Sequence, residues 1–290
     1  MNTTIIVTAG LLLLPAIVPS ARCAETVHRE VIRRTLAFSA PAGSSKRLVV
    51  DNISGSINVV GTNDTEVTLV AHETIRAESE GRIGSALEKI RLEVSEEPDR
   101  ILLYVDAPWR CQDGSIHDVG RDYYGYDATF DFELKVPINT DLFLKTVNDG
   151  EISVKNAQGS FRIENVNGGI SAAGLAGSGE FSTVNGNIGV EFSENPAGFS
   201  SFRTVNGRLD VRFQDDLSAD LRLKTFNGEV YTDFSVSSLP AVPLALPDHK
   251  RRHVYRTADS FLLRVGNGGG PTLSFDTVNG DIYILKNQRQ

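Results

Sequence analysis

The sequence is poor in the residues that build metal, redox and nucleic-acid sites. It has two cysteines, Cys23 and Cys111, together with one methionine and one tryptophan. Two cysteines without a Cys-x-x-Cys pair do not supply a structural zinc site. The formal net charge of -8 argues against a nucleic-acid partner, because phosphate backbones are bound by clustered lysine and arginine. We therefore expect no metal, no cofactor and no nucleic acid.

Long hydrophobic runs are confined to the N-terminus. Residues 5–18 are almost wholly apolar, a length too short for a membrane span but typical of an export signal. We expect a signal peptide over residues 1–24 and a mature chain without a membrane span, exported to the periplasm, the cell surface or the medium. Because residues 1–4 carry no lysine or arginine, an uncleaved anchor and a lipoprotein stay open. Cys23 is then removed, lipidated or paired with Cys111.

Glycine is the residue that the chain has in quantity. The 290 residues include 26 glycines, and 40% of the chain is hydrophobic. This composition is ordinary for a chain that buries a core, and the glycine content favours many short strands joined by tight turns over a helical bundle. A single elongated all-β unit can reach this length.

One short phrase, Val-Asn-Gly-x-Ile in loose form, occurs six times in the C-terminal half. Its glycines, at positions 150, 168, 186, 207, 228 and 280, are 18, 18, 21, 21 and 52 residues apart. Such spacing is typical of a small supersecondary unit that is repeated and interrupted once. The long interval predicts a loop insertion over residues 235–255, which contain three prolines. The six copies are residues 146–152, 165–170, 183–188, 204–209, 225–230 and 277–282.

Apolar and polar residues alternate on both sides of each copy, which predicts one strand before the glycine and one after it. Each repeat thus supplies two half-buried strands. The residues expected to face solvent are Arg208, Asp210 and Glu229. The residues expected to face the core are Val184, Ile188, Val190, Leu209, Val211, Val230 and Ile282.

Asn-Gly between two strands has two structural interpretations, because both residues tolerate the positive φ of a sharp corner. One is a type I′ turn, which gives an antiparallel hairpin meander. The other is the corner of a β-solenoid, in which coils stack in parallel and like residues form ladders. We prefer the solenoid-like stack, because it places identical residues of neighbouring coils side by side, where they can hydrogen-bond. The threonines that precede the asparagines would form a column in the same way. The predicted corner residues are Asn167, Gly168, Asn185, Gly186, Asn206, Gly207, Asn227, Gly228, Asn279 and Gly280.

In such a stack the corner asparagines are expected to hydrogen-bond to one another. If the rungs follow the order of the chain, Asn279 ends the stack and Asn206 lies inside it. Replacing Asn206 is then expected to cost more stability than replacing Asn279, because an interior loss affects partners on both sides.

Residues 25–145 carry the repeat in weaker form. The segment 53–59, Ile-Ser-Gly-Ser-Ile-Asn-Val, has serine where the repeat has asparagine. Further alternating runs follow, and one short helix is expected over residues 82–89. Because the terminal rung of a solenoid exposes unpaired strand edges, we interpret residues 25–145 as a β-rich N-terminal cap and residues 146–290 as the repeat part.

Four aromatic residues lie in a Gly- and Asp-containing segment without strand periodicity. Aromatic rings with polar neighbours suit contact with a sugar or peptide, although rings that fold back over the first rung give the same pattern. Glu151, Glu229 and Asp281 follow corner glycines, but other repeats place Gly, Asn or Arg there, so we assign no catalytic residue. The predicted ligand contacts are Trp109, Tyr123, Tyr124 and Tyr126.

The phrase over residues 49–59 and the recurring Thr-Val-Asn-Gly strands, the last over residues 277–284, resemble the bacterial putative-adhesin family of β-strand-repeat proteins, a domain of unknown function. The resemblance covers most of the mature chain. It implies an envelope-associated β-solenoid without established catalytic residues. We therefore expect an exported, non-enzymatic envelope or surface protein of structural or adhesive type, with an envelope glycan or a surface protein as partner. The alternative is a carbohydrate-binding or polysaccharide-active β-helix protein.

Overall fold

A computed structural model describes residues 25–41, 43–111, 115–116, 123–239, 261–267 and 269–287. The predicted signal peptide, 1–24, and residues 240–255 of the predicted loop lie outside the described residues. In chain order the elements are β1 (Thr26–Ala37), β2 (Arg47–Asp51), β3 (Ile57–Thr62), β4 (Glu66–Ala77), α1 (Glu80–Lys89), β5 (Arg91–Glu96), β6 (Arg100–Asp106), β7 (Tyr126–Pro137), β8 (Asp141–Lys145), β9 (Ile152–Lys155), β10 (Gln158–Glu164), β11 (Ile170–Ser182), β12 (Ile188–Glu194), β13 (Ser200–Asn206), β14 (Leu209–Phe213), β15 (Ala219–Asn227), β16 (Val230–Thr232), β17 (Val236–Ser238), β18 (Phe261–Val265), β19 (Thr272–Asn279) and β20 (Ile282–Lys286).

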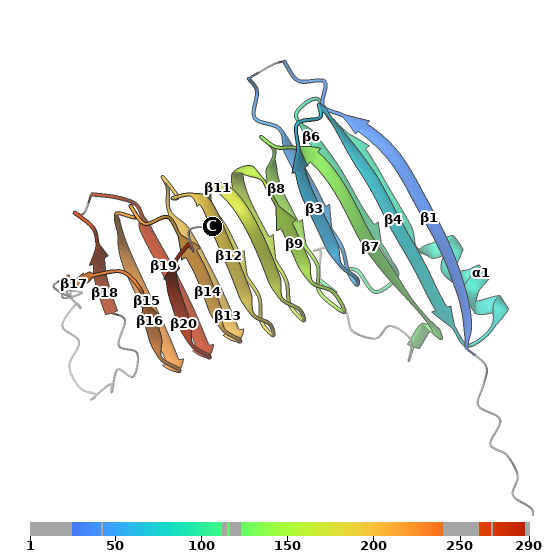
Figure 1. Ribbon diagram of the computed structural model, residues 1–290. Coiled ribbons are helices and arrows are strands. Elements are labelled where there is room, and N and C mark those ends of the chain that lie inside the picture. Colours follow the sequence, from blue (N-terminus) through green and yellow to red (C-terminus); the bar gives the residue numbers. More distant parts are fainter. Residues whose placement is uncertain are drawn as a thin grey trace, which may run out of the picture.

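The strands form one large sheet that folds over into two facing layers (Figure 1). The first layer runs β1-β4-β7-β3-β9-β11-β12-β14-β20-β16. The second layer runs β5-β6-β2-β8-β10-β11-β13-β19-β15-β18-β17. Strand β11 belongs to both layers, because its ladder is interrupted at Gly174, where φ is 69°. The predicted all-β class is confirmed.

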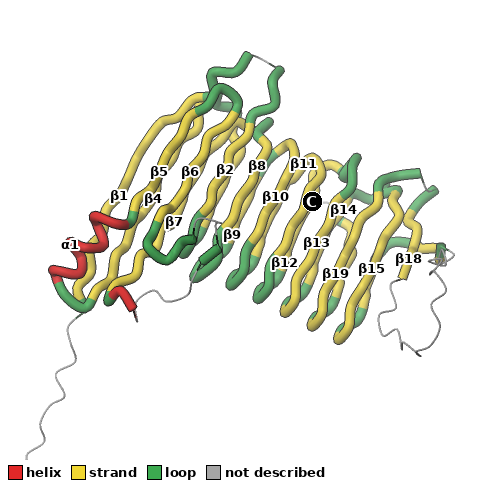
Figure 2. Tube along the Cα trace, turned by 180° about the vertical axis from the view of Figure 1, so that it is seen from behind, coloured by secondary structure: helices red, strands yellow, loops and turns green. Residues whose placement is uncertain are grey.

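The helix α1 agrees with the helix predicted over residues 82–89. It lies at the N-terminal end of the layers beside β1 and β4 (Figure 2). Its buried residues, Ile83 and Ala86, are one turn apart and therefore share a face. That face packs on the strands.

Repeats that are neighbours in space pair in parallel and in register. In the first layer Ile188 lies beside Leu209, and Leu209 lies beside Ile282. In the second layer Phe202 lies beside Phe275. The two strands that flank an Asn-Gly corner therefore belong to opposite layers. Antiparallel pairs occur toward the two ends, between β1 and β4, β4 and β7, β5 and β6, β15 and β18, and β17 and β18.

The spatial order of the repeats differs from their order in the chain. Strands β19 and β20, which come last, lie between β13 and β15 in one layer and between β14 and β16 in the other. The expectation that Asn279 ends the stack is therefore wrong, because Asn227 lies beyond it. The long interval between the fifth and sixth copies supplies the chain for this return, which includes β18 running antiparallel to β15.

Aromatic rings lie between the two layers and stack from rung to rung along the axis of the repeat stack. Phe181, Phe202 and Phe275 form one column, with centroid distances of 5.3 and 5.0 Å between neighbours. Phe192 and Phe213 form a second column, with their centroids 5.3 Å apart. The columns meet edge to face, because Phe192 lies 6.2 Å from Phe202 with an interplanar angle of 81°. All five side chains are fully buried and make the core continuous from rung to rung.

Burial of the repeat residues follows the predicted alternation with one exception. Val230 is half-buried, and Val184 is 38% exposed, so the predicted inward orientation of Val184 is wrong. Thr183 takes the inward position instead, because its hydroxyl donates to the carbonyl of Gly168 at 2.8 Å. Val184, the next residue of the corner that follows β11, then points outward. The residues that are buried as expected are Ile188, Val190, Leu209, Val211 and Ile282.

Candidate functional site

The predicted aromatic contacts mostly pack against one another. Trp109 and Tyr126 are buried, Tyr124 is half-buried and Tyr123 is 74% exposed. The Trp109 centroid lies 5.7 Å from that of Tyr124 and 6.0 Å from that of Tyr126. Tyr124 also donates its hydroxyl to the carbonyl of Pro108 at 3.2 Å. Three of the four rings thus stabilise the N-terminal part, and Tyr123 is the ring that a ligand can reach. A ligand contact there stays a prediction.

A buried cation fixes this segment to the sheet. The Arg110 side chain is 1% exposed, and its Nη1 lies 3.0 Å from Oδ2 of Asp51. Its guanidinium also lies over the ring of Tyr104, 4.3 Å from the centroid. Because Asp51 belongs to β2 and Tyr104 to β6, the aromatic segment is held against the second layer.

The corner residues form columns of side-chain hydrogen bonds along the stack. The amide of Asn185 donates to Oδ1 of Asn167, and that of Asn206 donates to Oδ1 of Asn185, both at 2.9 Å. Beside this exposed asparagine column, the hydroxyl of Thr204 donates to the carbonyl of Gly186 at 3.0 Å. In spatial order the column contains Asn148, Asn167, Asn185, Asn206, Asn279 and Asn227.

The corner glycines are required by the close approach of neighbouring rungs. A Cβ on Gly186 would lie 2.2 Å from the carbonyl oxygen of Gly168, and one on Gly207 would lie 1.9 Å from that of Gly186. The positive φ expected of these corners occurs at Gly280, where φ is 152°, and not at Gly168, Gly186 or Gly207. Steric exclusion of a side chain therefore explains most of the corner glycines.

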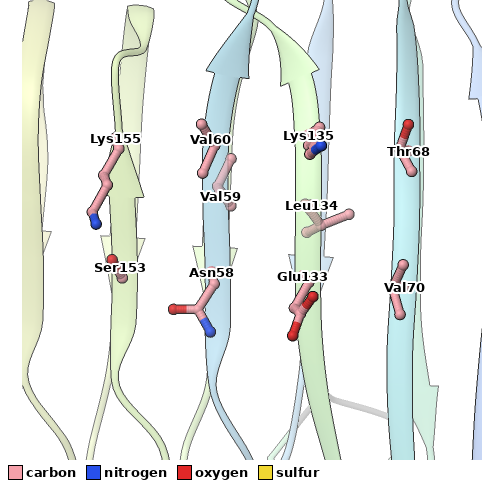
Figure 3. Close-up of a pocket in the computed structure, with 10 residues that line it drawn as sticks. All are labelled: Asn58, Val59, Val60, Thr68, Val70, Glu133, Leu134, Lys135, Ser153 and Lys155. Atoms are coloured by element: carbon pink, nitrogen blue, oxygen red, sulfur yellow. The ribbon is translucent and has the colours of Figure 1, made fainter.

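A shallow groove crosses the outer face of the first layer (Figure 3). It spans β4, β7, β3 and β9 and has a volume of about 390 Å³. The buried side chains of Val59 and Leu134 belong to the same strands and contribute to the core beneath it. The groove is lined by outward residues of these four strands, namely Asn58, Val60, Thr68, Val70, Glu133, Lys135, Ser153 and Lys155.

Charges of both signs lie along this groove. The exposed carboxylate of Glu133 lies 3.8 Å from Nε2 of His72. Lys135 and Lys155 are exposed and make no ion pair within the described residues. Both lysines are register partners of Val60, which lies between them and is 37% exposed. Two free ammonium groups around an exposed apolar side chain suit an anionic ligand that also has an apolar face.

Sequence reasoning missed this groove. Alternation over the weak repeat at 53–59 does turn Asn58 outward, as the structure shows. Its neighbours in space, Glu133 and Ser153, come from β7 and β9, which are distant from it along the chain. Only the pairing of β3 between these strands brings the polar groups together, and the sequence pattern did not indicate that pairing.

Of the acids that follow the corner glycines, Asp281 binds a neighbouring rung and Glu229 accepts from Tyr231 of its own repeat. Oδ1 of Asp281 accepts the backbone N–H of Glu229 at 2.9 Å. Within the described ranges, no group of three or more His, Cys, Asp and Glu side chains could hold a metal ion. In the same part of the chain, no helix is long and apolar enough to cross a membrane.

The chain is similar to solved structures over most of its length. One is a putative cell adhesion protein from Clostridium sporogenes ATCC 15579, with 10% identity, a TM-score of 0.38, and 90% of this chain and 100% of that chain covered. Another is a putative adhesin from Bacteroides fragilis NCTC 9343, with 10% identity, a TM-score of 0.32, and coverage of 89% and 97%. A third is a putative lipid binding protein from Parabacteroides distasonis ATCC 8503, with 10% identity, a TM-score of 0.26, and coverage of 89% and 97%.

Two of these three structures bear the adhesion or adhesin name of the family that the repeats resemble. No protein-family model and no curated protein matches the chain. Likenesses with such TM-scores carry no argument about a ligand.

Proposed function

We propose that this chain is an exported β-repeat protein of the bacterial envelope or surface, which acts in structure or adhesion and catalyses no reaction. The observation that carries the proposal is the groove on the outer face of the first layer, where Lys135 and Lys155 flank Val60. The groove is open along a wide sheet face, a form that suits reversible contact with a large partner. An envelope glycan or a surface protein is such a partner.

The architecture that we propose is a β-solenoid-like stack over residues 146–290 with a β-rich cap over residues 25–145. Parallel, in-register pairing of repeats that are neighbours in space supports the stack. The antiparallel strands β1, β4 and β7, together with α1, support the cap, because they lie at one end of the layers. The apolar run over residues 5–18 supports export.

A binding screen on the mature protein, residues 25–290, tests this function. The probes are isolated bacterial envelopes, peptidoglycan and a glycan array. We expect at least one envelope preparation to retain the protein. A doubly substituted protein, Lys135→Ala with Lys155→Ala, is expected to lose most of that retention, because both free ammonium groups of the groove are removed.

The matched control removes two positive charges from the outer side of the second layer, Arg203→Ala with Arg222→Ala. Both arginines are exposed, on β13 and β15. The control keeps the net charge of the groove variant but leaves the groove unchanged. Equal losses in the two variants would show nonspecific electrostatic adsorption, and the absence of any retained protein would contradict the proposal.

The alternative function is a polysaccharide-active enzyme. Such an enzyme would also bind an envelope glycan, but it would cleave the glycan as well. Release of new reducing ends from envelope polysaccharide by the mature protein, lost in the groove variant, would replace the proposed function by the alternative.

A further inference from the structure

A second shallow depression, about 280 Å³ in volume, lies on the same outer face of the first layer. It begins on β11, which is the hydrogen-bonded neighbour of β9, where the first groove ends. The small residues Ser171, Ala173 and Gly189 line one side together with the carboxylate of Glu191 on β12. The other side consists of Asp210 and Arg212 on β14 and of Arg208, which directly precedes that strand.

Strand register aligns the outward side chains of both depressions in two rows across the strands. The first row contains Glu133, Asn58, Ser153, Ser171, Gly189, Asp210, Tyr283 and Tyr231. The second row contains Lys135, Val60, Lys155, Ala173, Glu191, Arg212 and Leu285. Because neighbouring strands lie about 4.8 Å apart, the first row, from β7 to β16, is roughly 34 Å long.

An aromatic platform closes one end of these rows. The rings of Tyr231 and Tyr283 are stacked, with centroids 4.8 Å apart and planes at 11°. The Arg208 guanidinium lies over the other side of this pair, 5.3 Å from the Tyr283 centroid. Tyr231 is 43% exposed and lies on β16, which pairs only with β20 in the described part of the chain. An open phenol ring at this position can stack on the apolar face of a sugar.

Hydrogen bonds hold the platform in place. The Tyr231 hydroxyl donates to Oε2 of Glu229 at 2.5 Å, and this bond raises the pKa of Tyr231 to about 12. The carboxylate of Asp210 is held between two guanidiniums, 3.7 Å from Arg208 and 3.4 Å from Arg212. The free cations of the rows are thus Lys135 and Lys155 at the opposite end.

We propose that the two depressions form one track for a linear glycan that bears carboxylate groups and lies across the strands. Tyr231 stacks on a sugar ring at one end, and Lys135 and Lys155 bind carboxylates at the other. Between these two ends, Ser153 and Ser171 donate hydrogen bonds to hydroxyl oxygens of the glycan. Gly189 has no side chain and therefore leaves room for the glycan there. The inference rests on the proposed function, which it deepens by naming the ligand class.

The positive groups and the shape favour this occupant. Two unpaired lysines provide local charge complementarity for carboxylates at their end of the rows, although the rows also contain Glu133 and Glu191 and the chain carries a net charge of -8. A flat aromatic ring at one end of a row and hydroxyl and amide groups farther along it suit a chain of sugars, each of which has one apolar face and many hydroxyls. A row that repeats at every strand suits a polymer that also repeats.

Calorimetric titration of the mature protein with oligogalacturonates of increasing length tests the proposal, with the same oligomers after carboxyl reduction as the neutral control. We expect affinity to rise with length until the oligomer covers the track. Lys135→Ala with Lys155→Ala should weaken binding on the order of ten-fold, as the loss of two exposed ion pairs implies. Tyr231→Ala should lower the affinity for long oligomers more than the affinity for short ones.

A blocking variant separates the track from the rest of the surface. A Cβ built on Gly189 meets no atom closer than 4.0 Å, so the backbone leaves room for a side chain there and Gly189→Trp is expected to fill the track. It should abolish binding of long oligomers while the thermal midpoint stays unchanged. Ser274→Trp, on the outer side of β19 in the second layer, is the matched control and should bind as the unsubstituted protein does.

The outcomes distinguish this inference from the proposed function. If envelope preparations retain the protein but oligogalacturonate does not bind, or binds as well after carboxyl reduction, the acidic-glycan track is wrong and the proposed function stands. Binding that survives Gly189→Trp also overturns the track. If no envelope preparation retains the protein, the proposed function is wrong, and the inference that rests on it is wrong as well.

Discussion

The side-chain amide of Asn279 donates to Oδ1 of Asn206 at 2.7 Å, although the two residues are 73 positions apart in the chain. Asn206 in turn donates to Asn185, and Asn279 accepts from Asn227. Asn206 and Asn279 are thus both interior members of the column, each with two asparagine partners. Asn227 has one such partner and ends the column among the described residues.

Substitutions in this column are therefore expected to rank by the number of bonds lost. Asn206→Ala and Asn279→Ala should destabilise the protein by similar amounts, about 1 kcal/mol, and Asn227→Ala by about half of that. Chemical-denaturation midpoints measure the difference. A larger cost for Asn227→Ala than for Asn279→Ala would contradict the observed order of the rungs.

The corner glycines should be intolerant of any side chain. In Gly207→Ala the new methyl group would meet the carbonyl of Gly186 at 1.9 Å, which forces adjacent rungs apart, and a loss of about 3 kcal/mol is expected. Gly189→Ala is the control, because a Cβ there has open space. Thermal unfolding of both proteins tests the steric explanation, which fails if the two variants melt alike.

An acid at a buried strand position should prevent folding, whereas the same change at an exposed position in the preceding corner should not. Ile188 is 0% exposed, so Ile188→Asp places an unpaired charge in the core and should cost about 4 kcal/mol or more. Val184 is 38% exposed, so Val184→Asp should cost less than about 1 kcal/mol. Circular dichroism during urea titration distinguishes them. Equal effects would place Val184 inside after all.

Stability should depend on pH through Glu73. Burial raises the pKa of Glu73 above its ordinary value of 4.5, and the nearby carboxylate of Glu30 raises it further, against a smaller opposing effect of His28. The folded protein therefore keeps this proton to higher pH than the unfolded chain does. The resulting stabilisation is full below the unfolded-state pKa and is lost as the pH rises through the folded-state pKa.

Glu73→Gln is thus expected to stabilise the protein at neutral pH and to have no effect well below pH 4.5. Glu66→Gln, an exposed position on the same strand, serves as the control and should leave the pH profile unchanged. Unfolding midpoints measured across this pH range supply the test. A gain that persists at low pH would show an effect other than ionisation.

Export is expected to remove the apolar N-terminal segment. The mature chain should begin between Arg22 and Glu25, and N-terminal sequencing of protein collected outside the cytoplasm checks this. Retention of residues 1–18 on a membrane-bound form would establish the uncleaved anchor instead.

The sequence by itself determined the local chemistry of each rung. Identical residues recur at fixed intervals because stacking places them side by side, so the repeat predicts two strands and one corner in every copy. The alternation also predicts which side of each strand is apolar. It was wrong at Val184, because the pattern does not reveal that Thr183 takes the inward position to reach a carbonyl of the neighbouring rung.

Only the tertiary structure decided which rung lies beside which, and therefore what the surface presents. Ser153 and Asn58 share a groove, and Tyr231 stacks on Tyr283, because strands from distant parts of the chain pair in register. Similar corners offer similar hydrogen bonds to any neighbour, so the repeat alone does not distinguish one order of stacking from another. The order depends on the length of the connections and on packing between non-local strands, which a local pattern does not contain.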